Sequence, residues 1–198
     1  MKKKKIIFDP HRSANRGGLQ DTDSVVLELE NFLRPEQMEK LRALVDESSH
    51  HGVTEQGGDM SVNTDVRRSQ VHSLSVEVYK GLYDGMLQLA KMVNVKYLFD
   101  LKMQVEHVQI ASYDESDQGC YDWHMDWGRG TQGRRISISV PINNPDEYEG
   151  GQLEFNTSSE GTAVNQLMGK AVIFPSFLLH RVTPVTKGRR YSLVAWIH

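Results

Sequence analysis

Three potential metal ligands constrain this chain most, because the fold must bring them together from two separate segments. One residue separates His124 from Asp126, whereas 53 residues separate Asp126 from His180. Side chains two positions apart on a β-strand point to the same face, so a strand over 121–127 would present both ligands to one side. A second strand must then carry His180 beside them. The intervening length is enough for several antiparallel strands.

The residue types indicate the chemistry. Two imidazoles and one carboxylate on one face of a metal leave the opposite face open, as in the facial triad of non-haem Fe(II) oxygenases. Arg190 follows ten residues after His180 and opens a predicted strand, 190–197. On that strand Arg190 and Ser192 share a face. A guanidinium binds a carboxylate in a bidentate manner and a hydroxyl can add a donor, so the pattern predicts an iron site beside a site for 2-oxoglutarate.

The sequence pattern of the C-terminal half is typical of short strands separated by turns that contain glycine and proline. The expected strands cover 102–113, 135–142, 152–155, 171–174, 178–182 and 190–197. Apolar Ile136 and Ile138 alternate with Ser137 and Ser139, which indicates a sheet with one face in the core. Gly150-Gly151 is expected to form a tight bend or bulge. This pattern favours an all-β sandwich or barrel with flanking helices.

The N-terminal half is predicted to support that β-structure. A strand is expected within 24–32, followed by helices over 35–48 and 76–93 with apolar residues on one face. Between the helices, segment 50–65 is polar, contains three glycines and has no clear period, which predicts a long loop that serves as a lid. Residues 1–23 are polar and turn-rich, and we expect them to form a flexible or peripheral arm.

Several motifs resemble one enzyme family. They are Ala111–Tyr113, Tyr121–Asp126, Tyr148–Phe155, Ile173–Ser176 and His180–Val185, together with Gly188 and Arg190. In order and spacing, the run from about residue 105 to 198 resembles the 2-oxoglutarate/Fe(II)-dependent dioxygenases, and most closely their prolyl-4-hydroxylase-like branch. Some members of the family have lysine where this chain has Arg190, which distinguishes it from the collagen-type enzymes.

The resemblance implies a fold, a ligand set and a reaction. The fold is a double-stranded β-helix (jelly roll), mainly β with flanking helices (α+β), in which the N-terminal helices pack on the major sheet. The catalytic Fe(II) is held by His124, Asp126 and His180, and 2-oxoglutarate by Arg190, with Tyr113 in its pocket. The reaction consumes O2, releases succinate and CO2 and hydroxylates a C–H bond, with ascorbate as a candidate reductant. A peptidyl proline is the first candidate substrate.

The resemblance also defines the domain organisation that we expect. After the arm, residues 24–198 form a single oxygenase domain, with helical support over 24–100 and the jelly-roll core over 101–198. A length of 198 residues with 38% hydrophobic content suits one core.

Other interpretations stay open at this point. A jelly-roll module that retains metal without catalysis is the main alternative, and zinc hydrolysis is a third, since two histidines and a carboxylate also bind zinc. Arg190 has no assigned role in either. The substrate is either a protein or peptide, or a small molecule. Arg129, Arg134 and Arg135 form either an acidic-substrate contact or a solvated turn. The aromatic residues near the ligands either wall the cleft or pack structurally; they are Tyr121, Trp123, Trp127 and Trp196.

Composition excludes several classes of partner. A net charge of −3 gives no reason to expect nucleic-acid binding. No segment approaches the length of apolar sequence that a membrane helix needs. The single Cys120 cannot form an internal disulfide, and we expect a cytoplasmic protein. Oligomeric state is not indicated by the sequence.

Overall fold

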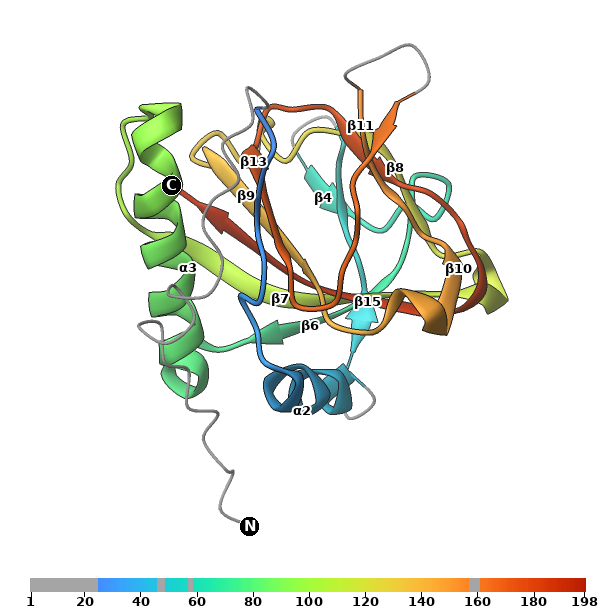
Figure 1. Ribbon diagram of the computed structural model, residues 1–198. Coiled ribbons are helices and arrows are strands. Elements are labelled where there is room, and N and C mark those ends of the chain that lie inside the picture. The colour runs from blue at the N-terminus through green and yellow to red at the C-terminus, as the bar shows by residue number, and fades with distance from the viewer. Residues whose placement is uncertain (1–24, 46–48, 57–58, 157–160) are drawn as a thin grey trace.

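The fold is a sandwich of two antiparallel β-sheets with helices on the outer face of the larger sheet. The computed structural model describes residues 25–45, 49–56, 59–156 and 161–198, so the predicted arm over 1–23 lies outside the described residues. The helices are α2 (Pro35–Val45) and α3 (Val76–Tyr97), and α3 is kinked at Tyr79. Both lie on the same side of the larger sheet (Figure 1).

The two sheets have different sizes and both are antiparallel. In spatial order the larger sheet contains β1 (Leu27–Leu29), β13 (Ala171–Pro175), β9 (Ile136–Pro141), β15 (Val185–Ile197), β7 (Val105–Asp114), β6 (Gln70–Leu74) and β2 (His50–His51), and β10 (Tyr148–Gly150) pairs with β15. The smaller sheet contains β12 (Thr162–Ala163), β11 (Leu153–Phe155), β14 (His180–Val182), β8 (Cys120–His124) and β5 (Arg67–Arg68). Two 3-10 turns, η1 (Glu115–Asp117) and η2 (Pro145–Glu147), complete this part of the chain. The predicted mainly β architecture with flanking helices is confirmed.

Strand alternation divides the larger sheet into an apolar outer face and a mixed inner face. On β9, Ile136, Ile138 and Val140 are completely buried against the helices. The alternate residues Ser137 and Ser139 point the other way, toward the smaller sheet, because successive side chains on a strand face opposite sides. The outer face therefore forms the main core, and the inner face is free to carry polar side chains.

The inner layer between the sheets contains two separate apolar clusters, one of which lies around β11. Leu153 and Phe155 of β11 pack there against Val172 and Phe174 of β13. Phe155 and Phe174 meet edge to face, with ring centroids 4.8 Å apart. Such a cluster fixes the distance between the sheets and leaves the rest of the layer available for a cavity.

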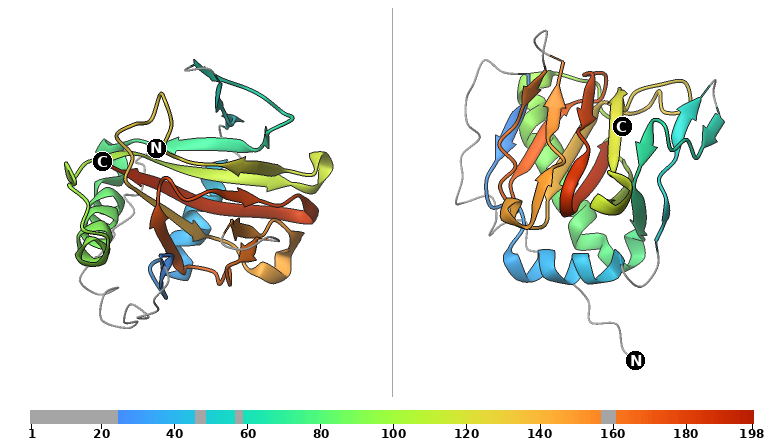
Figure 2. Two further views of the ribbon diagram at one scale, coloured as in Figure 1. Left: turned by 90° about the horizontal axis from the view of Figure 1, so that it is seen from above. Right: turned by 90° about the vertical axis from the view of Figure 1, so that its right-hand side faces the viewer.

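The predicted loop over 50–65 is wrong in part, because this segment contains short strands. β2 pairs with β6, with His50 opposite Val71 and His51 opposite Gln70. β3 (Thr54–Gln56) and β4 (Asp59–Ser61) form a separate two-stranded ladder, which projects from the sandwich (Figure 2). Backbone pairing does not require alternating apolar side chains, so the alternation of apolar and polar residues did not predict these strands. Closure of the segment over a substrate stays a prediction.

Other boundaries also differ from those expected. β1 has three residues instead of nine, α3 continues to Tyr97, and β15 starts at Val185, five residues earlier than predicted. The bend at Gly150 is confirmed: the register with β15 shifts between Glu149 and Gly150, and Gly150 has φ of 77°. An added Cβ there would lie 2.1 Å from the carbonyl oxygen of Pro184, so glycine is required.

One buried hydroxyl ties α3 to the larger sheet and gives a test of this packing. Tyr83 Oη donates to the carbonyl of Leu74 (2.8 Å) and accepts from the backbone N–H of Val108 (3.0 Å). Tyr83→Phe leaves both backbone groups without this partner, and we expect it to lower the free energy of unfolding by about 1–3 kcal/mol in urea titrations. The control Val95→Ala, at a position 79% exposed, should change it by less than about 0.5 kcal/mol. Equal effects of the two substitutions would contradict the bridging role.

Candidate metal centre

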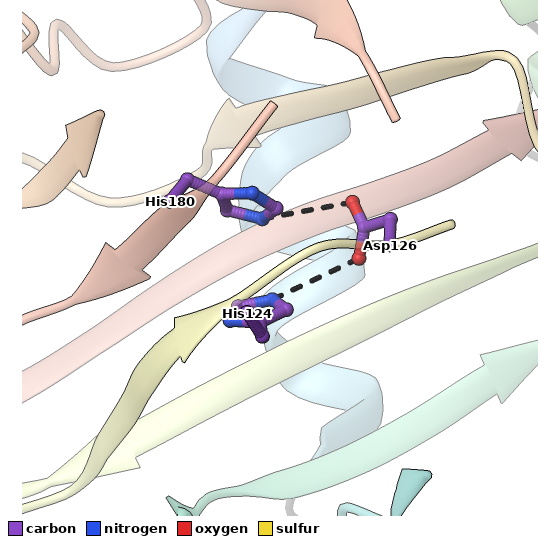
Figure 3. A group of neighbouring side chains, drawn as sticks. All are labelled: His124, Asp126 and His180. Carbon is purple, nitrogen blue, oxygen red and sulfur yellow. Dashed lines mark ion pairs between the residues drawn. The ribbon is translucent and has the colours of Figure 1, made fainter. Parts of the chain in front are cut away.

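The structure brings the three predicted ligands together between the two sheets. One ligand atom from each of His124, Asp126 and His180 lies within 4.8 Å of the other two. His124 Nε2 is 3.8 Å from Asp126 Oδ1, and His180 Nε2 is 3.6 Å from Asp126 Oδ2 (Figure 3). Among the described residues this is the one such group of histidine, cysteine and carboxylate side chains. The spacing is short enough for a single ion to bind all three.

A bulge in β8 delivers His124, which differs from the simple strand that we predicted. β8 pairs with β14 so that His124 lies opposite His180, and Tyr121 lies opposite Val182. The two paired residues are three positions apart on β8 but only two positions apart on β14. The extra residue in β8 forms the bulge, which turns Tyr121 and His124 to the same side. β8 ends at His124, so Asp126 lies after the strand and not on its face. The expectation that one regular strand carries both ligands is wrong.

The same backbone geometry orients both imidazoles. His124 Nδ1 lies 2.7 Å from the carbonyl oxygen of Asp122, and His180 Nδ1 lies 2.8 Å from that of Leu178. A carbonyl only accepts, so each Nδ1 carries the proton and each Nε2 presents its lone pair to the group. Fixing the tautomer through the second ring nitrogen is the usual way in which proteins prepare a histidine ligand.

Asp126 is fixed by groups on two other segments. Its Oδ2 accepts a hydrogen bond of 2.6 Å from Ser137, whose hydroxyl contacts that of Ser176 at 2.9 Å. The backbone N–H of Trp127 donates to the carbonyl of Ser176, and Thr131 Oγ1 donates to the carbonyl of Asp126. These bonds hold the carboxylate although it follows the end of β8. Oδ1 has no such donor among the described residues, which leaves it for a metal.

Burial and neighbouring charges set the protonation of the group. Burial, with the nearby His180, lowers the pKa of His124 from 6.5 to about 3. Burial alone would raise the pKa of Asp126, but the two histidines and the Ser137 hydrogen bond outweigh it and lower that pKa. At neutral pH the group therefore offers a neutral His124 imidazole and an ionised Asp126 carboxylate, the protonation that metal binding requires of these two ligands.

The three side chains line one end of a cavity between the sheets. Its other lining residues are Arg67, Gln109, Tyr113, Tyr121, Ser139, Leu153, Phe174, Val182, Arg190, Ser192, Val194 and Trp196. The inner face of β15 contributes four of them, as the alternation on that strand predicted. Trp196 Nε1 is buried without an acceptor in the part of the chain that the structure describes. Trp123 and Trp127 do not line the cavity, and Trp127 is 43% exposed.

Arg190 is the largest completely buried polar side chain of the cavity wall. It is 1% exposed, and its guanidinium carbon lies 5.3 Å from the centroid of the Tyr113 ring. Nη1 donates to Ser192 Oγ (3.1 Å), whereas Nε and Nη2 both donate to Gln166 Oε1 (3.1 and 2.7 Å). No carboxylate of the described residues pairs with it. Gln166 is itself held in place, because its Nε2 donates a hydrogen bond of 3.1 Å to the carbonyl of Gly151. The sequence gave no indication of this residue, since it lies outside every motif.

Arg134 has neither of the two roles proposed for it from the sequence. It is buried at 8% exposure, and it forms a bidentate ion pair with Glu106 (2.5 and 2.8 Å). Its guanidinium stacks over Trp196, and Nη1 lies 3.5 Å from the carbonyl of Asp126. Arg134 therefore supports the backbone of Asp126, one of the candidate ligands. A pattern of three arginines in a turn gave no indication of this burial.

Comparisons with known proteins agree with this geometry. Residues 108–198 match the model of the 2OG-Fe(II) oxygenase superfamily. A PKHD-type hydroxylase of Hyphomonas neptunium is 32% identical over 137 residues, which cover 67% of this chain and 60% of that protein. The chain belongs to the 2OG-Fe(II) oxygenase superfamily. It spans less than two thirds of the length of that hydroxylase.

Solved structures share the fold of this chain. A Pseudomonas putida prolyl-4-hydroxylase superposes with a TM-score of 0.70 at 21% identity, covering 89% of this chain and 94% of that one. A Trichoplax adhaerens prolyl hydroxylase, solved with a peptide fragment of the hypoxia inducible factor oxygen degradation domain, gives 0.69 at 19% identity over 88% and 84% of the two chains. The jelly-roll expectation is confirmed. No helix among the described residues has the length and apolar character needed to cross a membrane.

The low pKa of His124 gives a test that needs no metal. Because the folded state keeps this imidazole neutral down to about pH 3, the unfolded chain binds more protons below its ordinary pKa of 6.5. Stability should therefore fall as pH drops below 6.5. Between about pH 7.5 and about pH 5.5 the metal-free protein should lose about 1.4 kcal/mol through His124 in urea titrations. His124→Gln should show a loss smaller by that amount, and an unchanged loss would contradict a buried neutral imidazole.

Proposed function

We propose that this protein is an Fe(II)- and 2-oxoglutarate-dependent dioxygenase that hydroxylates a C–H bond of its substrate. In this proposal His124, Asp126 and His180 hold the catalytic iron, and Arg190 holds the cosubstrate with Ser192 and Tyr113. The observation that carries it is the pairing of a largely buried two-histidine, one-carboxylate group with a buried arginine that no described carboxylate neutralises, both facing one cavity. Bound iron, 2-oxoglutarate and O2 supply the oxidising chemistry, which yields succinate, CO2 and a hydroxylated product.

The residues fit iron by donor type and by accessibility. Nitrogen, nitrogen and carboxylate oxygen suit Fe(II), and the remaining side of the group faces the cavity, as catalysis requires. The protein's own contribution is position. The bulge in β8 and the Ser137 hydrogen bond fix the ligands between the two sheets.

The buried charge of Arg190 weighs against the alternatives. A metal-retaining binding module or a zinc hydrolase gives this guanidinium no anion, although burying an uncompensated charge is costly. The carboxylate of 2-oxoglutarate distant from the keto group provides the missing charge. Nη1 and Nη2 are the nitrogens that could bind it, because each has two N–H groups and uses one of them, for Ser192 and Gln166, whereas the single N–H of Nε already donates to Gln166. Tyr113 forms an aromatic wall beside them.

A protein or peptide substrate is our proposal for the hydroxylated compound, with a peptidyl proline as the first candidate. The fold shared with two prolyl hydroxylases supports it, one of them solved with a peptide fragment. Ascorbate is proposed as the reductant that keeps the iron ferrous, and the cytoplasm as the compartment, since a single cysteine suits a reducing environment.

Succinate release tests the activity directly. The purified protein with Fe(II), ascorbate and 2-oxoglutarate should release succinate slowly, and a productive proline peptide should accelerate release in parallel with its own gain of one oxygen atom by mass spectrometry. Iron-loaded protein that forms no succinate with any compound would favour a binding module. Succinate formation that responds to small metabolites and not to peptides would redirect the substrate assignment.

Substitutions of the ligand group should separate metal binding from folding. His124→Ala, Asp126→Ala and His180→Ala should each weaken Fe(II) binding under anaerobic conditions, because two protein ligands hold this ion poorly. Iron content after gel filtration measures the effect. His72→Ala, a histidine outside the group, is the control and should retain the iron content of the unchanged protein. Retention of one iron by the Asp126→Ala protein would place the metal elsewhere.

Substitutions of Arg190 and Gln166 should weaken the binding of 2-oxoglutarate and leave the binding of iron unchanged. Arg190→Ala removes a charge-assisted contact worth roughly 1.5–3 kcal/mol, so the 2-oxoglutarate dissociation constant should rise about ten- to a hundredfold. Gln166→Glu puts a carboxylate on the same guanidinium and should also weaken binding, more than Gln166→Ala does, because it supplies a competing anion. Calorimetric titration of the iron-loaded variants measures both. Unchanged affinity in Arg190→Ala would place the anchor at another residue.

A further inference from the structure

A second buried arginine faces the same cavity and is not used by the proposed reaction. Arg67 is 8% exposed and lines the cavity with the candidate ligands. Its guanidinium carbon lies 4.7 Å from the centroid of the Tyr121 ring, and that ring stacks on the imidazole of His124 at 3.4 Å between centroids. One tyrosine ring therefore separates this cation from a candidate iron ligand.

The guanidinium of Arg67 is held in place but not neutralised. Nε donates to Ser69 Oγ (2.8 Å) and Nη1 to the carbonyl of Val53 (3.0 Å), so both known partners are neutral acceptors. Among the side chains that the structure describes, no carboxylate forms an ion pair with Arg67, and none accepts a hydrogen bond from Nη2.

The local backbone leaves space for this arginine. Gly52 lies against the guanidinium, and an added Cβ there would be 2.4 Å from Arg67 Nε and 2.7 Å from its central carbon. Gly52 has an ordinary backbone conformation, because its φ is not among the positive values. Glycine at this position therefore leaves the room that the buried Arg67 side chain requires.

A charge balance of the cavity shows what is missing. The lining residues that carry a fixed charge are Arg67, Asp126 and Arg190. In the proposed complex Fe(II), Arg190 and Arg67 together carry four positive charges, whereas 2-oxoglutarate and Asp126 together carry three negative charges. One positive charge is then left over, and Arg67 is buried at 8% exposure, where an unpaired ion is costly. One further anion restores neutrality.

We propose that Arg67 forms a second anion subsite, which binds a carboxylate of the primary substrate beside the iron. The inference rests on the proposed function for the roles of iron and 2-oxoglutarate. It limits the substrate to compounds with a carboxylate close to the carbon that is hydroxylated. An acidic side chain next to that residue in a peptide, or a small carboxylic acid, would supply the same group.

Paramagnetic relaxation in the Mn(II)-substituted protein saturated with 2-oxoglutarate tests the subsite without turnover. Propionate and its uncharged counterpart propionamide are the probes, and the relaxation rate of their protons reports binding close to the metal. Propionate should show saturable enhancement and propionamide none. A capped Ala-Glu-Ala peptide and its glutamine counterpart form the second pair, which separates an acidic peptide from a free acid as the source of the carboxylate.

Variants assign the effect to Arg67. Arg67→Gln should weaken propionate binding at least about tenfold, because it removes a charge-assisted contact. Arg68→Gln is the matched control, since that side chain bonds to the carbonyls of Thr64 and Gln118, and it should bind propionate like the unchanged protein. If Arg67→Gln fails to fold, Gly52→Ala displaces the guanidinium and keeps its charge, and it should weaken propionate binding as well.

The outcomes separate this inference from the proposed function. Propionate binding that is equal in Arg67→Gln and the unchanged protein overturns the subsite. A weakened 2-oxoglutarate affinity in Arg67→Gln, with no effect on propionate, would make Arg67 part of the cosubstrate site and also overturns it. If the unchanged protein does not bind 2-oxoglutarate, the proposed function fails, whereas Arg67-dependent propionate binding in that protein would still support an anion subsite.

Discussion

The pairing of β8 with β14 is the constraint on which the rest of the site depends. It places His124 opposite His180, and the bulge in β8 turns the His124 imidazole into the layer between the sheets. The bulge also puts the carbonyl of Asp122 under Nδ1 of His124, which selects the tautomer that presents Nε2 to a metal. Asp126 then needs support from elsewhere, and Ser137 on the larger sheet provides it. The candidate centre therefore exists only when the two sheets are stacked in this register.

Electrostatics explains why the inner face of the larger sheet is polar. A sandwich gains most stability from an apolar interior, yet β15 places Arg190 and Ser192 there, and β5 places Arg67 at the edge of the smaller sheet. Neutral acceptors hold both guanidiniums in place without cancelling their charge. A cavity built this way is stable when anions and a cation occupy it together, which links ligand binding to the stability of the sandwich.

Much of this could be predicted from the sequence, since the relevant patterns are local. Alternation on 136–142 and 190–197 predicts which side chains face the helices and which face the cavity, and the motif spacing predicts the three clustered side chains. The bulge, the position of Asp126 beyond the strand, and the contacts of Gln166, Arg67 and Arg134 could not be predicted. They depend on pairing between segments distant in sequence, and no local period records it. The short strands of 50–61 were missed for the same reason.

An anaerobic crystal structure with Fe(II) and 2-oxoglutarate tests the central claim most directly, because it observes both ligand sets at once. The account predicts one iron bound by His124 Nε2, His180 Nε2 and an oxygen of Asp126, with the keto acid end of 2-oxoglutarate on the metal and its other carboxylate on Arg190. Iron at another position would contradict the account, and so would a 2-oxoglutarate carboxylate seated on Arg67 with Arg190 left bonded only to Gln166 and Ser192.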